Sequence, residues 1–331
     1  MSLLPLLKPS QMHIPDGFLS WPVALVFWAI SAALIILAIR RSRAELGERQ
    51  VPLMGVMAAF VFAAQMINFP VAGGTSGHLL GGALVAILLG PWEGMLVMTS
   101  VIGVQALLFQ DGGLVVMGAN IFNMGLLTVL VGYGLYRGMA RRSARTRLLT
   151  AGVAAWLSVI AGALSTSLQL WLSGTAMLSV VVPAMLGVHA LIGLGEALIT
   201  VGALAFIFRT RPDLVAAQRS PESGGKGWIA AGLLVALVVV LLSPFASANP
   251  DGLMRVATDL GFLQQGEKAP LRLLPGYILP AIGVSAISKV LAGAIGLAVV
   301  AVLAILIARF LRPNDAGKHT GGQASAQDHQ P

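Results

Sequence analysis

The chain has no cysteine among its 331 residues, and only 10% of its residues are charged. The absence of cysteine excludes disulfides, thiolate metal sites and cysteine nucleophiles. The charged fraction is far below the roughly 25% that is typical of soluble domains, whereas 57% of the residues are hydrophobic. This composition indicates a membrane protein. The net charge of +8 does not indicate nucleic-acid binding, because most basic residues lie in short tracts between apolar runs.

The motifs of common enzymes and ATPases are also missing. The sequence has no H-E-x-x-H zinc motif, no P-loop and no dinucleotide-binding glycine pattern, and no Ser/His/Asp set is discernible. Any ATP-driven role would therefore need another subunit. The first ten residues do not have the features of a cleavable signal, because they lack its basic segment, its longer apolar run and its small-residue cleavage site.

Apolar runs long enough for membrane helices recur along the chain. A helix needs about 20 apolar residues to cross the hydrocarbon core. We therefore predict an all-α polytopic membrane protein with nine helices, near 21–40, 51–68, 78–90, 94–110, 114–136, 148–172, 178–208, 228–246 and 278–309. The third and fourth runs are short and joined by "GPWEG", which is compatible with a tight hairpin or a re-entrant pair. The last run contains Pro280 and Lys289, so its span could be limited to 290–309, after an interfacial stretch.

Most of the 21 basic residues lie in four tracts, which follow the first, fifth, seventh and last helices. Counting helices places all four tracts on one side of the membrane, and the positive-inside rule makes that side the cytoplasm. We therefore expect a multi-pass protein of a bacterial or archaeal plasma membrane. Its amino terminus would lie outside and its carboxyl terminus inside.

Changes in composition suggest the organisation of the chain. We expect a seven-helix unit at 12–210, a polar cytoplasmic linker at 211–227 and a two-helix module with an external loop at 228–312. Residues 313–331, rich in Gly, Gln and Ala, are expected to be a disordered tail. Residues 1–11 are expected to be an extension that is removed or arises from a mis-set start codon.

Two histidines on the predicted outer face are candidate metal ligands. His13 lies before the first helix, and His78 lies at the entrance to the third. Imidazoles without thiolates suit Ni²⁺, Co²⁺, Cu²⁺ or Zn²⁺. If the mature chain begins at Met12, its amine, the amide nitrogen of His13 and the imidazole Nδ1 form two fused chelate rings, and His78 completes a square of nitrogens. The competing interpretations are a polar anchor at the interface and close packing of the surrounding glycines.

The seventh predicted helix carries a second candidate pair. His189 and Glu196 are seven residues apart and share one face of the helix. An ionisable pair within a membrane is typical of an ion or proton relay. It is equally typical of a hydrogen-bonded pair that pins helices together.

Four motifs in order carry a family resemblance: "MHIPDGFLS", "NFPVAGGTSGHLLGGALVAILLGPWEGMLVMT", "QALLFQDGGLVVMGANIFNMG" and "HALIGLGEALIT". Together they resemble, over residues 12–208, the CbiM/NikM substrate-capture (S) component of cobalt/nickel energy-coupling-factor transporters. The later "SANPDGLMRVATDLGF" at 247–262 resembles the PDGLE/NikN-type module that accompanies or is fused to such components.

The resemblance implies a seven-helix S component that opens outward and takes Co²⁺ or Ni²⁺ as its transported substrate. It implies that Met12, His13 and His78 hold the metal. The remaining candidates in these motifs, as supporting or relay residues, are Asp16, Asn68, Ser76, His189 and Glu196. The implied partners are a transmembrane T component (CbiQ/NikQ-like) and two ATPase subunits (CbiO/NikO-like), with ATP-driven toppling of the loaded S unit.

Two points stay open in the sequence. In the family the Met-His pair opens the protein, whereas here eleven residues precede Met12; a retained extension would turn the amine into an amide. The alternative function is an ion- or proton-coupled secondary transporter that uses His189 and Glu196, and a membrane enzyme ranks third. Cobalt and nickel both fit nitrogen ligands.

Overall fold

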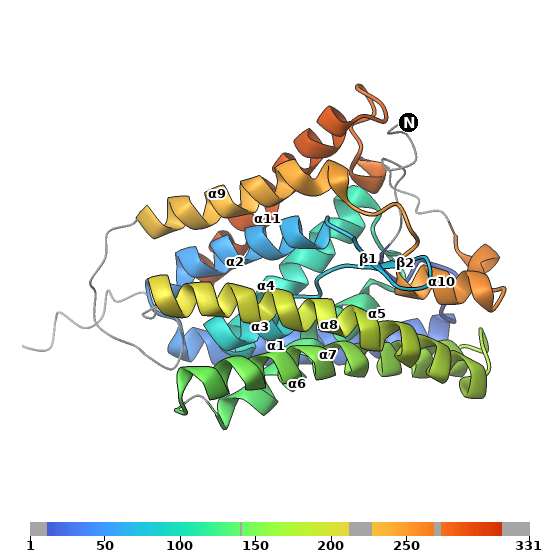
Figure 1. Cartoon of the computed structure of the whole chain (residues 1–331), viewed down its shortest axis with the longest axis horizontal. Coiled ribbons are helices and arrows are strands. Elements are labelled where there is room, and N and C mark those ends of the chain that lie inside the picture. The colour runs from blue at the N-terminus through green and yellow to red at the C-terminus, as the bar shows by residue number, and fades with distance from the viewer. Residues whose placement is uncertain (1–11, 140, 212–226, 268–272, 313–331) are drawn as a thin grey trace, which may run out of the picture.

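The computed structural model describes residues 12–139, 141–211, 227–267 and 273–312. The predicted extension at 1–11, nearly all of the predicted linker and the predicted tail lie outside these residues. Seven described helices are long and apolar enough to cross a membrane: Trp21–Arg43, Pro91–Phe109, Met117–Arg137, Ala144–Leu172, Leu178–Thr210, Gly227–Phe245 and Ala286–Leu311. Figure 1 shows the long helices lying roughly side by side. The prediction of an all-α polytopic membrane protein is confirmed.

The part of the chain before residue 211 contains the seven predicted helical runs. The third run is shortened to an eight-residue helix, and the fourth and fifth each contain a π-helical turn. In chain order the elements are α1 (Trp21–Glu45), α2 (Gln50–Gln65), β1 (Phe69–Val71), β2 (Thr75–Gly77), α3 (Gly82–Leu89), α4 (Pro91–Val104), η2 (Gln105–Phe109), α5 (Met117–Asn120), η3 (Ile121–Leu126), α6 (Leu127–Arg137), α7 (Ala144–Leu172) and α8 (Leu178–Thr210).

Helix α3 is shorter than its predicted span. It has eight residues, all buried, and is therefore about 12 Å long, too short to cross the hydrocarbon core. Gly90, at φ 101°, separates it from α4, and an added Cβ at Gly94 of α4 would touch the backbone of Ala86. The two helices thus form the tight hairpin that the short runs allowed. Helix α4 begins at Pro91 rather than at 94, because proline suits the first helical position, where no N–H partner is needed.

A β-hairpin precedes α3, where the sequence indicated only a helix end and a loop. Strands β1 and β2 pair antiparallel, with Phe69 opposite Gly77. Gly73 and Gly74 make the turn at positive φ, a conformation that glycine adopts without steric cost. Helix α2 therefore ends at Gln65, earlier than the predicted 68. The hairpin leaves His78 as the first residue after β2.

The C-terminal part contains α9 (Gly227–Leu242), η5 (Ser243–Phe245), α10 (Gly252–Asp259), η6 (Leu263–Gln265), η7 (Pro275–Tyr277) and α11 (Ala286–Leu311). Helix α10 was not predicted, because its eight residues are far fewer than the roughly 20 apolar residues by which membrane helices were identified. Helix α11 starts at Ala286, later than the predicted 278, because Ser285 caps it by accepting a hydrogen bond from the Ser288 amide. An irregular stretch precedes it, in agreement with the predicted interfacial segment.

Helices α9 and α11 pack directly on α2. An added Cβ at Gly55 of α2 would lie 2.5 Å from the side chain of Ile305, and one at Gly232 of α9 would lie 2.5 Å from that of Val56. Small residues at such crossings let helix backbones approach closely. The C-terminal helices are therefore part of the same bundle as the earlier ones.

The two ends of the bundle differ in character. Strands β1 and β2 and helix α10 gather at one end, the right-hand end in Figure 1. At the other end, arginines stack on aromatic rings of neighbouring helix termini: Arg43 on Phe310, Arg147 on Phe208 and Arg211 on Trp228. One arginine from each of three basic tracts thus lies at the end opposite the hairpin.

Candidate metal-capture site

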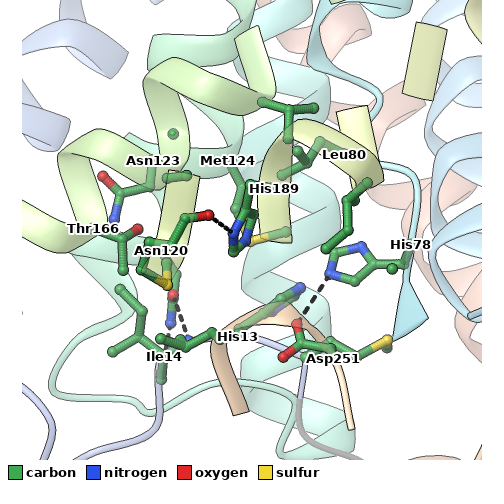
Figure 2. Close-up of a pocket in the computed structure, with 18 residues that line it drawn as sticks. His13, Ile14, His78, Leu80, Asn120, Asn123, Met124, Thr166, His189 and Asp251 are labelled. Carbon is green, nitrogen blue, oxygen red and sulfur yellow. Dashed lines mark hydrogen bonds and ion pairs between the residues drawn. The ribbon is translucent and has the colours of Figure 1, made fainter. Parts of the chain in front are cut away.

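A cavity of about 60 Å³ lies at the hairpin end of the bundle, between the amino-terminal segment, the residue after β2, α8 and the start of α10. Figure 2 shows three histidines and one carboxylate around it. Of the predicted site residues, Met12, His13, His78 and His189 line this cavity. The other four, Asp16, Asn68, Ser76 and Glu196, do not line it and instead bind backbone groups around it.

The structure brings the two predicted imidazole ligands together. The ring centroids of His13 and His78 are 5.9 Å apart, although 65 positions separate the residues in the sequence. His13 is 1% exposed and His78 is 7% exposed. Two buried imidazoles facing one cavity can share a cation between them, provided that their lone pairs face it.

Asn120 of α5 holds the segment that carries His13. Its Oδ1 accepts a hydrogen bond of 3.0 Å from the Ile14 amide, and its Nδ2 donates one of 3.0 Å to the Ile14 carbonyl. The backbone N–H and C=O of Ile14 are thus both bonded by one side chain. The sequence motif that contains Asn120 was recognised, but this role was missed, because the two residues are 106 positions apart.

Asp111 binds the Met12–His13 pair from a second side. Its Oδ1 accepts a hydrogen bond of 2.8 Å from the Met12 backbone nitrogen. Its backbone carbonyl lies 2.8 Å from His13 Nδ1. Since a carbonyl oxygen only accepts, Nδ1 carries the hydrogen and Nε2 keeps the lone pair in the neutral ring. This Nε2 is buried and has no hydrogen-bond partner among the described residues.

His78 presents the same nitrogen to the cavity. Its Nδ1 donates to the Leu79 carbonyl at 3.0 Å, so Nε2 again holds the lone pair. Burial, and secondarily the nearby His13, lowers the pKa of His78 below its usual value. The imidazole is therefore neutral near pH 7, which is the form that binds metal ions.

His189 follows the same pattern from helix α8. Its Nδ1 donates to the Met185 carbonyl at 2.8 Å, which leaves Nε2 as the acceptor atom of the neutral ring. The structure thus places a third imidazole on the cavity, as Figure 2 shows.

Glu196, two turns further along α8, does not face His189. Its buried carboxylate accepts hydrogen bonds from the backbone amides of Leu80 and Gly81, at 2.6 and 2.8 Å. These bonds fasten the segment after His78 to α8, and helix α3 begins at Gly82 because Gly81 has a left-handed conformation, with φ 84°. The geometry favours the hydrogen-bonded interpretation of this carboxylate over the relay interpretation.

Asp16 has a comparable anchoring role. Its carboxylate accepts hydrogen bonds of 2.9–3.2 Å from three successive backbone amides, those of Leu114, Val115 and Val116. The bonds fix the turn after His13 against the loop that contains Asp111.

Ser76 and Asn68 hold the loop before α10. The Ser76 amide donates to the Pro250 carbonyl at 2.9 Å, and its hydroxyl donates to the Asn249 carbonyl at 2.8 Å. The backbone carbonyl of Asn68 accepts a hydrogen bond of 2.7 Å from the Ser247 amide.

This docking of the loop brings Asp251 to the cavity, where its Oδ2 lies 3.8 Å from His78 Nε2. Burial raises the pKa of Asp251 to about 8. The motif quoted at 247–262 contains Asp251, but the sequence analysis gave this residue no role.

The donors available to a cation are therefore few. Within the described ranges, no three His, Asp or Glu side chains are grouped closely enough to hold an ion as they stand. Tight binding would need further donors, and the backbone nitrogens of the Met12–His13 pair lie beside the two imidazoles. The predicted chelate uses the Met12 nitrogen and His13 Nδ1. Both atoms are bonded to Asp111 here, so chelation requires that these bonds break.

The structure is that of a multi-helix membrane protein with three imidazoles around a buried cavity at one end. Residues 13–214 match the sequence profile of the family described as the cobalt uptake substrate-specific transmembrane region. Residues 226–313 match the PDGLE domain. The first match covers more than half of the chain. The chain therefore belongs to this family, as its motifs predicted, and it is a transport component rather than an enzyme.

Similar proteins support this assignment. A protein of Archaeoglobus fulgidus named for fused nickel transport (NikMN) is 37% identical, over 91% of this chain and 99% of its own length. A protein of Haloquadratum walsbyi named for metal transport is 46% identical, over 62% of this chain and 94% of its own. A crystal structure described as a truncated transition-metal transporter is 33% identical, with a TM-score of 0.55, over 60% of this chain and 99% of that one.

Proposed function

We propose that this protein captures Co²⁺ or Ni²⁺ outside the plasma membrane, as the substrate-specific component of an energy-coupling-factor ABC transporter. The observation that carries the proposal is the buried pair of His13 and His78, whose rings lie 5.9 Å apart. Both rings have Nδ1 bonded to a backbone carbonyl. With these bonds in place, the two Nε2 lone pairs are available to one cation in the cavity. The chelate through the Met12 nitrogen and His13 Nδ1 forms only when their bonds to Asp111 break.

The distribution of charge supports the direction of capture. The arginines of the basic tracts gather at the end of the bundle opposite the cavity, and basic tracts face the cytoplasm in most membrane proteins. The cavity then opens to the outside, where the substrate is taken up.

The ligand set that we propose is Met12, His13 and His78, with His189 as a further imidazole on the cavity wall. Nitrogen ligands suit both Co²⁺ and Ni²⁺. The family description refers to cobalt, and the fused relative is named for nickel, so the proposal includes both ions.

The energy source would be supplied by partners. No nucleotide-binding motif occurs in the sequence, so transport would need a T component (CbiQ/NikQ-like) and ATPase subunits (CbiO/NikO-like). This composition is the one that the sequence resemblance implies.

The test is metal binding by purified protein and uptake by the reconstituted complex. His78→Ala is expected to lose high-affinity Ni²⁺ and Co²⁺ binding in calorimetry, while its circular dichroism is unchanged. His329→Ala, which removes an imidazole from the carboxyl-terminal tail, is the matched control and should bind like the unmodified protein. Unchanged metal content in His78→Ala would overturn the proposed site.

A further inference from the structure

The C-terminal module reaches into the candidate metal site. Three hydrogen bonds dock its loop on the hairpin that precedes His78. They run from the Ser247 amide to Asn68, and from the Ser76 amide and hydroxyl to the loop carbonyls of Pro250 and Asn249. A parallel bridge also pairs Ser76 with Asp251. These contacts of the loop backbone bring Asp251 to the cavity.

Gly252 fixes the other side of this contact. A Cβ added there would lie 2.7 Å from Ile192 Cδ1 and 2.9 Å from His189 Cε1. Only glycine allows the loop to lie this close to α8. Asp251 is thus held between β2 and α8, at the wall of the cavity.

The two carboxylate oxygens of Asp251 face different partners. Oδ1 accepts a hydrogen bond of 3.0 Å from the Met254 amide and so caps α10. Oδ2 lies 3.8 Å from His78 Nε2, as the dashed line in Figure 2 marks. Asp251 is 5% exposed, and among the described residues it is the only acidic one that lines the cavity.

The distance between these two atoms fits a bridging cation. Metal–nitrogen and metal–oxygen bonds at borderline ions such as zinc are about 2.1 Å long, and two such bonds that meet at an obtuse angle span about 3.8 Å. A second polar atom, the buried and unpartnered Nε2 of His13, belongs to the same cavity wall.

Charge balance also favours a carboxylate here. A divalent ion on neutral nitrogen ligands brings uncompensated positive charge into a buried site, which is costly unless a counter-charge is present. Carboxylate oxygen is an acceptable ligand for Co²⁺ and Ni²⁺ beside imidazole.

We propose that Asp251 of the C-terminal module is a metal ligand that binds the captured ion through Oδ2, together with His78 Nε2. The module therefore completes the capture site, in addition to any role in coupling. This inference rests on the proposed function, because it uses the same site.

The competing role of Asp251 is the cap of α10, and the choice of variant separates the two roles. Asparagine caps helices as well as aspartate does, so Asp251→Asn keeps the cap and removes the acidic group that a bound cation would ionise. Asp259→Asn is the matched control. It removes an exposed carboxylate from the end of the same helix, where Asp259 pairs with Arg255.

The experiment uses the full chain, with calorimetric titration of NiCl₂ and CoCl₂ and the visible spectrum of the Co²⁺-loaded protein. Asp251→Asn is expected to weaken binding by about 10- to 100-fold and to shift the ligand-field bands of Co²⁺, with unchanged thermal unfolding of the metal-free protein. Asp259→Asn is expected to change neither affinity nor spectrum.

Two results would overturn the inference in distinguishable ways. If Asp251→Asn binds both ions with unchanged affinity and spectrum while His78→Ala loses them, Asp251 is only a cap and the proposed function stands. If His78→Ala also binds like the unmodified protein, the proposed site fails together with this inference.

Discussion

The hydroxyl of Tyr277 donates a hydrogen bond of 2.8 Å to Oδ2 of Asp111, across 166 positions of sequence. The other oxygen of Asp111 accepts from the Met12 amide. One carboxylate therefore joins the amino-terminal ligand segment to the C-terminal module. The ring of Tyr277 also stacks on Phe109, with centroids 4.7 Å apart. Gln110 lies between Phe109 and Asp111 and has a φ of 56°. Such a positive φ is uncommon outside glycine and is found often at functional sites.

Tyr277→Phe should destabilise the protein, because it removes this bond to a buried carboxylate. Burial and the adjacent Asp111 raise the pKa of Tyr277 well above its usual value, so the hydroxyl stays protonated and donates at all moderate pH values. We expect a loss of about 1.5–3 kcal/mol, measured by thermal unfolding in detergent. Tyr133→Phe, which removes a hydroxyl from α6, is the control, and equal losses in both variants would contradict the special role of the Asp111 contact.

Asn120→Ala should weaken metal binding without touching a ligand. The variant leaves the amide and carbonyl of Ile14 without their partner, and each unsatisfied buried group costs about 1–3 kcal/mol. The segment that carries His13 is then no longer held. Calorimetry should show weaker Ni²⁺ binding, whereas Gln169→Ala, whose amide bonds Asn123 and Ser165, should lower stability and leave the affinity of folded protein unchanged.

Glu196→Gln tests the relay interpretation. A glutamine offers one acceptor to two backbone amides, so the segment after His78 should loosen and metal affinity should fall. Any uptake that the Glu196→Gln complex retains should still depend on ATP and should resist a protonophore. If collapse of the proton gradient abolished uptake by the unmodified complex in liposomes supplied with ATP, the carboxylate would have to be considered a relay.

Membrane orientation can be tested with single cysteines, because the chain contains none. Arg142 and Gln264 are both exposed, at the basic end and in the loop after α10. In intact cells an impermeant thiol reagent should label Gln264→Cys and should leave Arg142→Cys unlabelled until the cells are opened. The reverse pattern would place the cavity on the cytoplasmic side.

The start of the mature chain should control affinity. A protein that begins at Met12 has a free amine there, which can form the chelate with His13, whereas the longer chain has an amide whose proton is far harder to remove. We expect the shorter protein to bind Ni²⁺ or Co²⁺ more tightly, with affinity that rises with pH as protons leave the ligand nitrogens. Equal affinities, with both starts verified by amino-terminal sequencing, would show that the amine is not a ligand.

The sequence by itself determined the class, the family and the approximate helices, because about 20 apolar residues and four ordered motifs are local signals. It also singled out His13 and His78. It did not reveal the β-hairpin of β1 and β2, which depends on a turn of a few residues. It also did not reveal that Glu196 accepts from backbone amides more than 100 positions away. Only the tertiary structure showed that Asn120, Asp111 and Asp251 surround the same two histidines. Hydrogen bonds and charge contacts act over a few ångströms in space, and separation along the chain carries no record of which groups the fold brings within that reach.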